Sequence, residues 1–372
     1  MKNRREFLST LAATVAVTVV SPTTFVWAAE QFPADIAESY HKSVVIDTLC
    51  GPFPSLDDMP DNAAVETVRR SGVTAINFTI SAPTFDGTIE NLAYIDVLVE
   101  RWPDVFMLIR KQTDIELAKR EGKVGIIPGF QYTQFLESDP SRIELFRKLG
   151  VRIMQLTYNN RSIFGDGCLE PGNAGLSKAG VDAVHKMNEL GIAVDLSHSG
   201  YRTTSEAIAA SKKPVLITHS GCAAIYAHPR SKPDDVMKAL ADKGGYFGVY
   251  LMPYLVASPT VPTREHVINH VLGAINTCGA DHVGIGSDGS IQGVSLTPEQ
   301  KRSFDEDIAR RKKLGIGAPG EDRYPYVPDL NGADHMEVIA AELKTRGQSS
   351  SVIERVLGAN FQRIIGEIWG TA

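Results

Sequence analysis

Short apolar, β-branched runs alternate along this chain with longer stretches in which apolar residues recur every three or four positions. The short runs predict eight strands: Val44–Thr48, Val73–Ile80, Val124–Gly129, Arg152–Thr157, Ile192–Leu196, Pro214–Thr218, Tyr246–Leu251 and Val283–Ser287. The longer stretches predict amphipathic helices between them: Ile89–Arg101, Arg142–Leu149, Leu176–Leu190, Pro233–Ala241 and Arg264–Asn276. This alternation predicts a parallel sheet wrapped by helices.

Eight strand–helix units favour one closed α/β domain, a (β/α)8 TIM-type barrel, over residues 30–372. The alternative is a doubly wound open sheet. That fold would call for a glycine-rich phosphate loop after an early strand, and the sequence has none. The polar segment 297–334 contains a helical pattern at Pro298–Lys313, and we expect it to be an inserted loop over one end of the barrel.

The first 29 residues have the features of an export signal. Residues 3–8 read Asn-Arg-Arg-Glu-Phe-Leu, which is typical of a twin-arginine motif, and an apolar run at Leu11–Val20 follows. That run is short for a membrane span. We therefore expect export to the periplasm through the twin-arginine machinery, with an uncleaved membrane anchor as the alternative.

Composition narrows the classes of partner. The formal net charge is −6, and the sequence after residue 29 holds no basic run or aromatic-plus-basic patch, which argues against nucleic acid. The four cysteines, at positions 50, 168, 222 and 278, match no CxxC zinc pattern. We expect at least two of them to be buried free thiols, although an oxidising compartment would permit disulfides. A homodimer is left open.

Residues of metal-ligand type follow three of the predicted strands. His198 comes after the fifth strand, His219 after the sixth and Asp288 after the eighth. The carboxyl ends of the strands build the active site in such a barrel. Any one of these residues could be structural, but together they predict a catalytic metal site with one position open to water. The other histidines fall in loops, in helices or at a strand start, and we expect them to be structural.

Several ordered motifs give the chain a resemblance to the renal (membrane) dipeptidase family of metallopeptidases. The motifs are Leu-Gly-Val-Arg at 149–152 with Gln-Leu-Thr at 155–157, Asp-Leu-Ser-His at 195–198, Thr-His-Ser at 218–220, His-Pro-Arg at 228–230 and Val-Leu-Gly-Ala-Asn-Phe-Gln-Arg at 356–363. The resemblance covers almost the whole chain after the export signal. The resemblance implies a zinc-dependent hydrolase on a (β/α)8 barrel.

The resemblance also implies roles for individual residues. His198 and His219 match two histidines of one zinc ion, and Asp288 matches an aspartate that binds the other ion and handles a proton. Arg230 matches the arginine that holds the free carboxylate of the substrate. An arginine suits that task because its planar guanidinium can donate two parallel hydrogen bonds.

The sequence departs from the family at several ligand positions. Leu49 and Gly51 stand where the first strand should carry a His-x-Asp pair, and Gln131 stands where a bridging glutamate should be. Tyr158 replaces a histidine that polarises the substrate carbonyl. We therefore expect at most one divalent metal per chain, with zinc the expected ion, held among His198, His219, Asp288 and Gln131.

These observations leave three functions open. The first is hydrolysis of a dipeptide or similar small amide by metal-activated water, with Asp288 and Tyr158 catalytic and with Arg230, Tyr158 and Asn159 binding substrate. The second is a retired or repurposed dipeptidase scaffold that binds or matures a small peptide without two-zinc hydrolysis. The third is metal-free chemistry in which Asp288 and Tyr158 act as acid and base.

Overall fold

The computed structural model of the protein describes residues 32–56, 58–136, 139–314 and 318–370. The export signal expected at residues 1–29 lies outside these ranges. The chain from Phe32 onward forms one compact unit. Within the described ranges, every helix is too short or too polar to span a bilayer.

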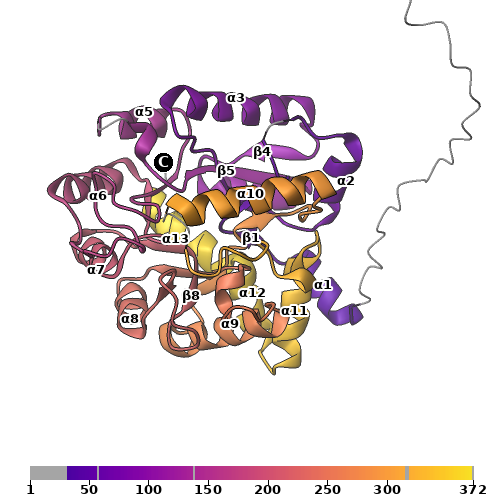
Figure 1. The fold of residues 1–372 in the computed structure, drawn as a ribbon. Coiled ribbons are helices and arrows are strands. Elements are labelled where there is room, and N and C mark those ends of the chain that lie inside the picture. The colour runs from indigo at the N-terminus through magenta and orange to yellow at the C-terminus, as the bar shows by residue number, and fades with distance from the viewer. Residues whose placement is uncertain (1–31, 57, 137–138, 315–317, 371–372) are drawn as a thin grey trace, which may run out of the picture. The chain divides into compact units, whose positions relative to one another are not determined.

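Eight parallel strands form the central sheet (Figure 1). In spatial order they are β1 (Ile46–Asp47), β3 (Ala75–Thr79), β5 (Val124–Phe130), β6 (Ile153–Gln155), β7 (Ala193–Asp195), β8 (Leu216–Cys222), β10 (Tyr246–Val249) and β11 (Val283–Ile285). The first and last strands meet, because the backbone N–H of Thr48 donates to the carbonyl of Ile285 at 3.0 Å. Just beyond, β2 (Cys50–Gly51) pairs in parallel with β12 (Gly289–Ser290). The predicted (β/α)8 barrel is confirmed, and the open sheet is excluded.

Each predicted strand range overlaps one barrel strand, although the ends differ. The largest change is in β8, which runs to Cys222, four residues past its predicted end at Thr218. Four short strands were not predicted. They are the pair β2 and β12, β4 (Phe106–Leu108), which pairs with β5, and β9 (Ser231–Lys232), which pairs with β8. Each is only two or three residues long, so hydrophobic periodicity gives almost no signal for it.

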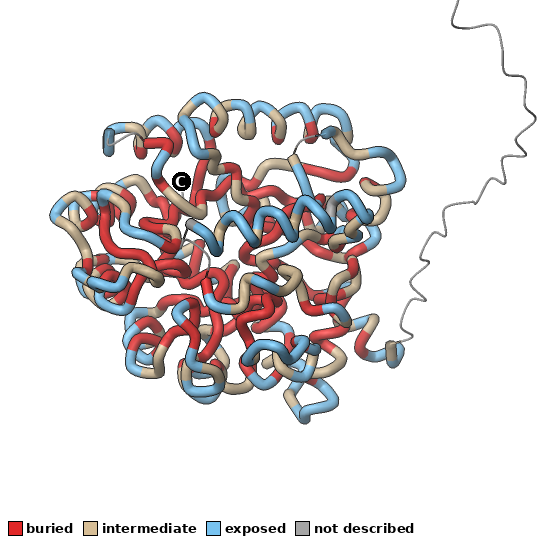
Figure 2. Tube along the Cα trace, in the orientation of Figure 1, coloured by how far each residue is buried: buried red, intermediate tan, exposed pale blue. Residues whose placement is uncertain are grey.

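The helices surround the strands in Figure 1, and their outward sides are exposed in Figure 2. They are α1 (Ala34–Lys42), α2 (Asn62–Arg70), α3 (Phe85–Arg101), α4 (Gln112–Glu121), α5 (Arg142–Lys148), α6 (Lys178–Leu190), α7 (Tyr201–Ala210), α8 (Asp234–Asp242), α9 (Arg264–Cys278), α10 (Pro298–Leu314), α11 (His335–Thr345), α12 (Ser350–Glu354) and α13 (Asn360–Trp369). Helix α6 shows how local sequence sets the ends. The Ser177 side chain caps its first turn, and Gly191 ends it at φ 64°.

Helix α13 packs against one set of inward-facing strand residues. Phe361, Ile364, Ile365 and Ile368 form a buried cluster with residues near the strand starts, including Ile46, Ile153, Ala193, Leu216 and Tyr246. Burial of this apolar face removes water from the amino-terminal end of the barrel. The carboxyl end is therefore the end at which polar side chains are free to form a site.

A buried ion pair holds the end of β1. Nε2 of His335 lies 3.2 Å from Oδ2 of Asp47, and both side chains are almost fully buried. Oδ1 of the same carboxylate accepts the backbone N–H groups of Ser287 and Leu49. Burial alone would lower the pKa of His335, but the hydrogen bond and charge of Asp47 raise it. The pair thus links α11 to both strands at which the barrel closes.

Replacing His335 with alanine should lower the free energy of unfolding by about 3–5 kcal/mol, because it leaves a buried carboxylate without its cation. Since the folded-state pKa of His335 is raised, its contribution is present at low pH and is lost as pH rises through that pKa. Denaturant unfolding at several pH values measures both effects. Glu367→Ala, which breaks an exposed helical pair with Arg363, is the control and should change little. A His335 variant as stable as the parent would contradict this account.

Candidate metal and substrate site

Three side chains of metal-ligand type come together at the carboxyl end of the barrel. His198 follows β7, His219 lies in β8 and Asp288 follows β11. One ligand atom from each lies within 4.8 Å of the other two. Both histidines are buried. The predicted convergence of these three residues, here named the histidine–aspartate cluster, is what the structure shows.

Each histidine is oriented through its Nδ1 atom. Nδ1 of His198 lies 2.7 Å from Oδ1 of Asn159, which can only accept, so that nitrogen carries the proton. Nδ1 of His219 lies 2.8 Å from the hydroxyl of Thr218, and that hydroxyl donates to Asp195. The Thr218 oxygen therefore accepts from His219. Both Nε2 atoms are left as buried lone pairs without a hydrogen-bond partner.

The electrostatic surroundings keep these imidazoles neutral. Burial, followed by the charge of Arg230, holds the pKa of both His198 and His219 well below the usual range. A neutral imidazole with an unshared Nε2 lone pair is the form that binds a metal ion. The tautomers that the Nδ1 hydrogen bonds impose thus leave on each Nε2 atom the lone pair that a metal ion needs.

Asp288 has an unusual backbone conformation that aims its side chain into the barrel mouth. Its φ is 59°, in the left-handed region, and its N–H donates to the carbonyl of Leu49 at 2.8 Å. Nε2 of Gln131 donates to its Oδ1 at 3.0 Å. Burial raises the pKa of Asp288 to about 6, although Arg230 and Gln131 act in the opposite direction. Gln131 therefore lies beside the cluster. It presents its amide N–H to the Asp288 carboxylate, so its role as a metal ligand remains a prediction.

The cluster has the donor set for one divalent ion. Two unpartnered imidazole nitrogens and one carboxylate oxygen fit a three-ligand site with room for water. The residues present do not fit a second ion, because Leu49 and Gly51 offer no ligand atom. Asp47, the nearest carboxylate in sequence, is occupied by His335. The Cys50 thiol donates to a carbonyl at 3.2 Å, and burial raises its pKa well above the usual value.

Arg230 is fully buried beside the cluster, next to β9. Its Nη1 donates to the carbonyl of Ser197 at 2.6 Å, and its guanidinium lies 5.8 Å from the centre of the Tyr250 ring. Its Nη2 has no hydrogen-bond partner. The position is set by His228, which accepts the Arg230 N–H through Nδ1 and donates to the carbonyl of Pro319 through Nε2. A buried cation with an unused donor is suited to an anionic group of a ligand.

Tyr158 and Asn159 reach the cluster in different ways. The Tyr158 ring stacks on His198, with centroids 4.1 Å apart. Burial, then the charge of Asp288, raises its pKa to about 12, so the phenol stays protonated and can donate. Asn159 is buried with its amide oxygen on His198. The structure thus gives Asn159 a positioning role, and its direct contact with substrate remains a prediction.

Sequence reasoning missed a second buried cation, Lys232. Its ammonium donates to the carbonyl of Ser199 at 2.6 Å and to the hydroxyl of Thr204 at 3.3 Å, so neutral oxygens hold it. Burial lowers its pKa to about 7. A lysine beside two prolines and two aspartates reads as a surface residue in sequence. The structure places Lys232 in β9, two residues after Arg230. There its charge adds to the positive potential that lowers the pKa of His198 and His219.

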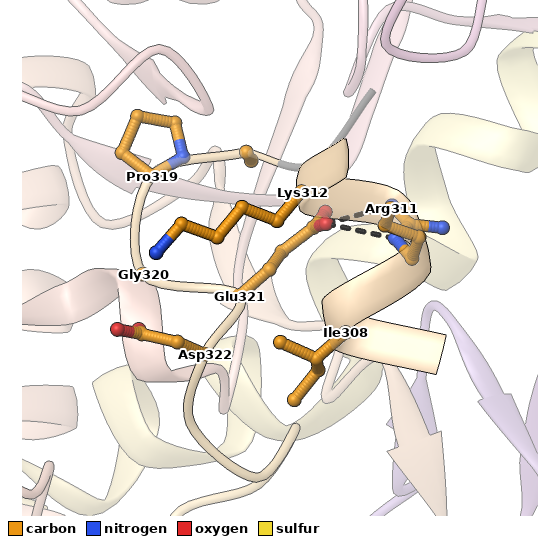
Figure 3. Close-up of a pocket in the computed structure, with 8 residues that line it drawn as sticks. Ile308, Arg311, Lys312, Pro319, Gly320, Glu321 and Asp322 are labelled. Atoms are coloured by element: carbon orange, nitrogen blue, oxygen red, sulfur yellow. Dashed lines mark hydrogen bonds and ion pairs between the residues drawn. The ribbon is translucent and has the colours of Figure 1, made fainter. Parts of the chain in front are cut away.

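The cavities near this end of the barrel include two of more than 300 Å³. One of about 320 Å³ is lined by Leu49, Gly51, Phe78, Gln131 and Asp288 among others, and so adjoins the cluster. The other, of about 340 Å³, lies between the end of α10 and residues 318–322 (Figure 3). Its wall carries the Arg311–Glu321 ion pair at 2.7 Å but no member of the cluster. We therefore place the site at the first cavity and the cluster.

All four cysteines are free thiols, and three are buried. The histidines outside the cluster also behave as expected where the structure shows their partners. His270 and His282 make hydrogen bonds to backbone carbonyls, and His335 pairs with Asp47. None of these side chains adds a ligand to the cluster.

Comparison with known proteins agrees with this geometry. The family profile of the membrane dipeptidases (peptidase family M19) matches residues 58–303. Dipeptidase verJ of Clonostachys rogersoniana is 31% identical over 286 residues, which are 76% of this chain and 65% of that protein. Dipeptidase tcpJ of Claviceps purpurea is 28% identical over 284 residues, 76% of this chain and 60% of that protein. The chain therefore matches less than two thirds of the length of these two relatives.

A solved structure covers more of the chain. The crystal structure of an amidohydrolase from Pseudomonas aeruginosa aligns with 90% of this chain and 99% of its own, at 31% identity and a TM-score of 0.79. The fold and the cluster define a (β/α)8 barrel of the metal-dependent hydrolase type. The chain belongs to the membrane dipeptidase family, peptidase family M19.

Proposed function

We propose that this protein is a hydrolase that uses one divalent metal ion, zinc, to cleave a dipeptide or similarly small amide with a free carboxylate. The observation that carries the proposal is the arrangement of two unpartnered histidine nitrogens and Asp288 beside Arg230, whose Nη2 is also unpartnered. Membership of a metallopeptidase family supports the class of reaction.

In this proposal His198, His219 and Asp288 hold the ion. When bound, a divalent ion lowers the pKa of a coordinated water toward neutrality and polarises a carbonyl. Arg230 binds the substrate carboxylate and so fixes the amide in the barrel mouth. Asp288 can take up a proton at a carboxylate oxygen and return it to the leaving amine. Tyr158 donates a hydrogen bond to the carbonyl oxygen.

The second candidate is a dipeptidase scaffold that binds or matures a small peptide without hydrolysis. The specific observation in its favour is the absence of ligand atoms at Leu49 and Gly51 and of a negative charge at Gln131. Removing anionic ligands weakens a two-ion site, because two dications need negative charge between them. A third candidate keeps Asp288 and Tyr158 as acid and base with no metal.

We predict that the purified protein, saturated with Zn²⁺ and freed of excess ion, holds at most one zinc per chain. Elemental analysis by mass spectrometry measures the ratio. His219→Ala should abolish binding, because it removes one of only two imidazoles. Two tightly held ions per chain would contradict the ligand assignment, and turnover by fully metal-free protein would favour the third candidate.

A milder variant tests the orientation of His219. Thr218→Val removes the hydroxyl that fixes the Nδ1–H of His219, and loss of such a partner weakens metal binding roughly 10- to 100-fold. Chelator competition measures the affinity. Thr67→Val, on the exposed side of α2, is the matched control and should bind Zn²⁺ as the parent does.

We also predict that Arg230→Ala weakens binding of a dipeptide carboxylate by about 2–5 kcal/mol, since one buried charge-assisted contact is lost. Calorimetry with a free dipeptide and its carboxyl-terminal amide separates this effect from general damage. The parent should discriminate strongly between the two ligands, and the Arg230 variant should not. Equal affinity of parent and variant for the free acid would exclude Arg230 as the carboxylate anchor.

For localisation we propose export to the periplasm by the twin-arginine pathway. The support is the Arg-Arg pair at positions 4–5 followed by the apolar run Leu11–Val20. Cell fractionation compares the full chain with a variant in which Arg4 and Arg5 are replaced by lysine. The parent chain should reach the periplasm and the variant should not. Accumulation of both proteins in the periplasm would exclude this route.

A further inference from the structure

The cavity of about 320 Å³ beside the cluster has mainly apolar walls. Leu49, Phe53, Leu56 and Phe78 line it from the ends of β1 and β3 and from the loop after β2. Leu49, Phe53 and Phe78 are themselves buried. Its polar lining consists of Ser55, Thr79, Gln131 and Asp288, and Asp288 is shared with the histidine–aspartate cluster. We name this space the apolar cavity.

The walls are packed in a way that leaves no place for a ligand side chain at position 51. A Cβ atom added to Gly51 would lie 3.1 Å from Cε2 of Phe78 and 2.9 Å from the carbonyl oxygen of Phe53. The second distance is shorter than real Cβ contacts, so the backbone at Phe53 would have to shift. Phe78 therefore occupies space next to Gly51, and the pocket is built around an aromatic wall.

The apolar cavity and Arg230 lie on opposite sides of the barrel mouth. Arg230 lies just before β9, which pairs with β8, the sixth strand in the ring order. The cavity lies at the ends of β1 and β3, the first and second strands in that order. In an eight-strand ring the sixth position faces the second. The histidine–aspartate cluster lies between the two walls.

We propose that the apolar cavity is a side-chain pocket that selects dipeptides with a bulky apolar residue, of the phenylalanine or leucine kind, on the amino side of the cleaved bond. The inference rests on the proposed function. With the carboxylate at Arg230 and the amide at the cluster, the amino-side residue is the part of a dipeptide that reaches the opposite wall. A cavity of about 150 Å³ with apolar walls holds a benzene ring, so the observed volume is ample.

The experiment compares phenylalanyl-alanine with glycyl-alanine as ligand and as substrate. Burying a phenyl side chain should favour the first by roughly 10- to 100-fold in both affinity and kcat/KM. Leu49→Trp fills the cavity and should lower this ratio at least tenfold. Leu49→Ala enlarges it and should raise the preference for tryptophanyl-alanine. Val97→Trp, on the exposed side of α3, is the matched control for adding an indole and should leave the ratio unchanged.

Calorimetry on each variant separates failure of the pocket from failure of the hydrolase proposal. Preferential binding of phenylalanyl-alanine without turnover of any dipeptide would overturn hydrolysis and support the pocket. Equal binding of the two dipeptides by the parent protein would overturn the pocket, whatever the turnover. The pocket would also be overturned if both Leu49 variants fold, as judged by circular dichroism, and keep the parental ratio of phenylalanyl-alanine to glycyl-alanine affinity.

Discussion

The contact between the first and last strands is the constraint on which the site depends. The Thr48 hydroxyl lies 2.7 Å from the carbonyl of Thr218 and 2.9 Å from that of Ile285, inside the barrel. The strands can approach this closely because Gly248 and Gly286 have no side chain, and a Cβ at either would lie 2.0 Å from the Thr218 oxygen. Closure then places Asp288 against Leu49 and within reach of the two histidines.

Charge around the site is distributed unevenly. Arg230 and Lys232 are buried on one side of the barrel mouth and are held by hydroxyl and carbonyl oxygens. A buried charge is costly unless it is compensated by hydrogen bonds or by a counter-ion. The same cations lower the pKa of both histidines and so favour the neutral, metal-binding form. A ligand with a carboxylate would supply the missing negative charge.

The ligand set that the family resemblance implies has two halves, and this chain retains side-chain ligands in only one of them. The half at β7 and β8 keeps both imidazoles and the hydrogen bonds that orient them. The half at β1 has no ligand atom at Leu49 or Gly51. Leu49 and Phe78 line a cavity there, and Asp47 pairs with His335. Apolar side chains suit a position without ligand atoms, since a polar pocket without an ion would have to remain hydrated.

Local pattern in the sequence determined the eight strands, most helices and the convergence of His198, His219 and Asp288, because each depends on periodicity or on position after a strand. The absence of ligand atoms at positions 49 and 51 was also evident from residue type alone. Only the tertiary structure decided which nitrogen of each histidine is free, that Asn159 holds His198 and that Lys232 is buried. It also decided that Asp47 pairs with His335, which lies 288 positions later in the chain. These features depend on contacts between side chains far apart in the chain, and such contacts exist only after the barrel has closed.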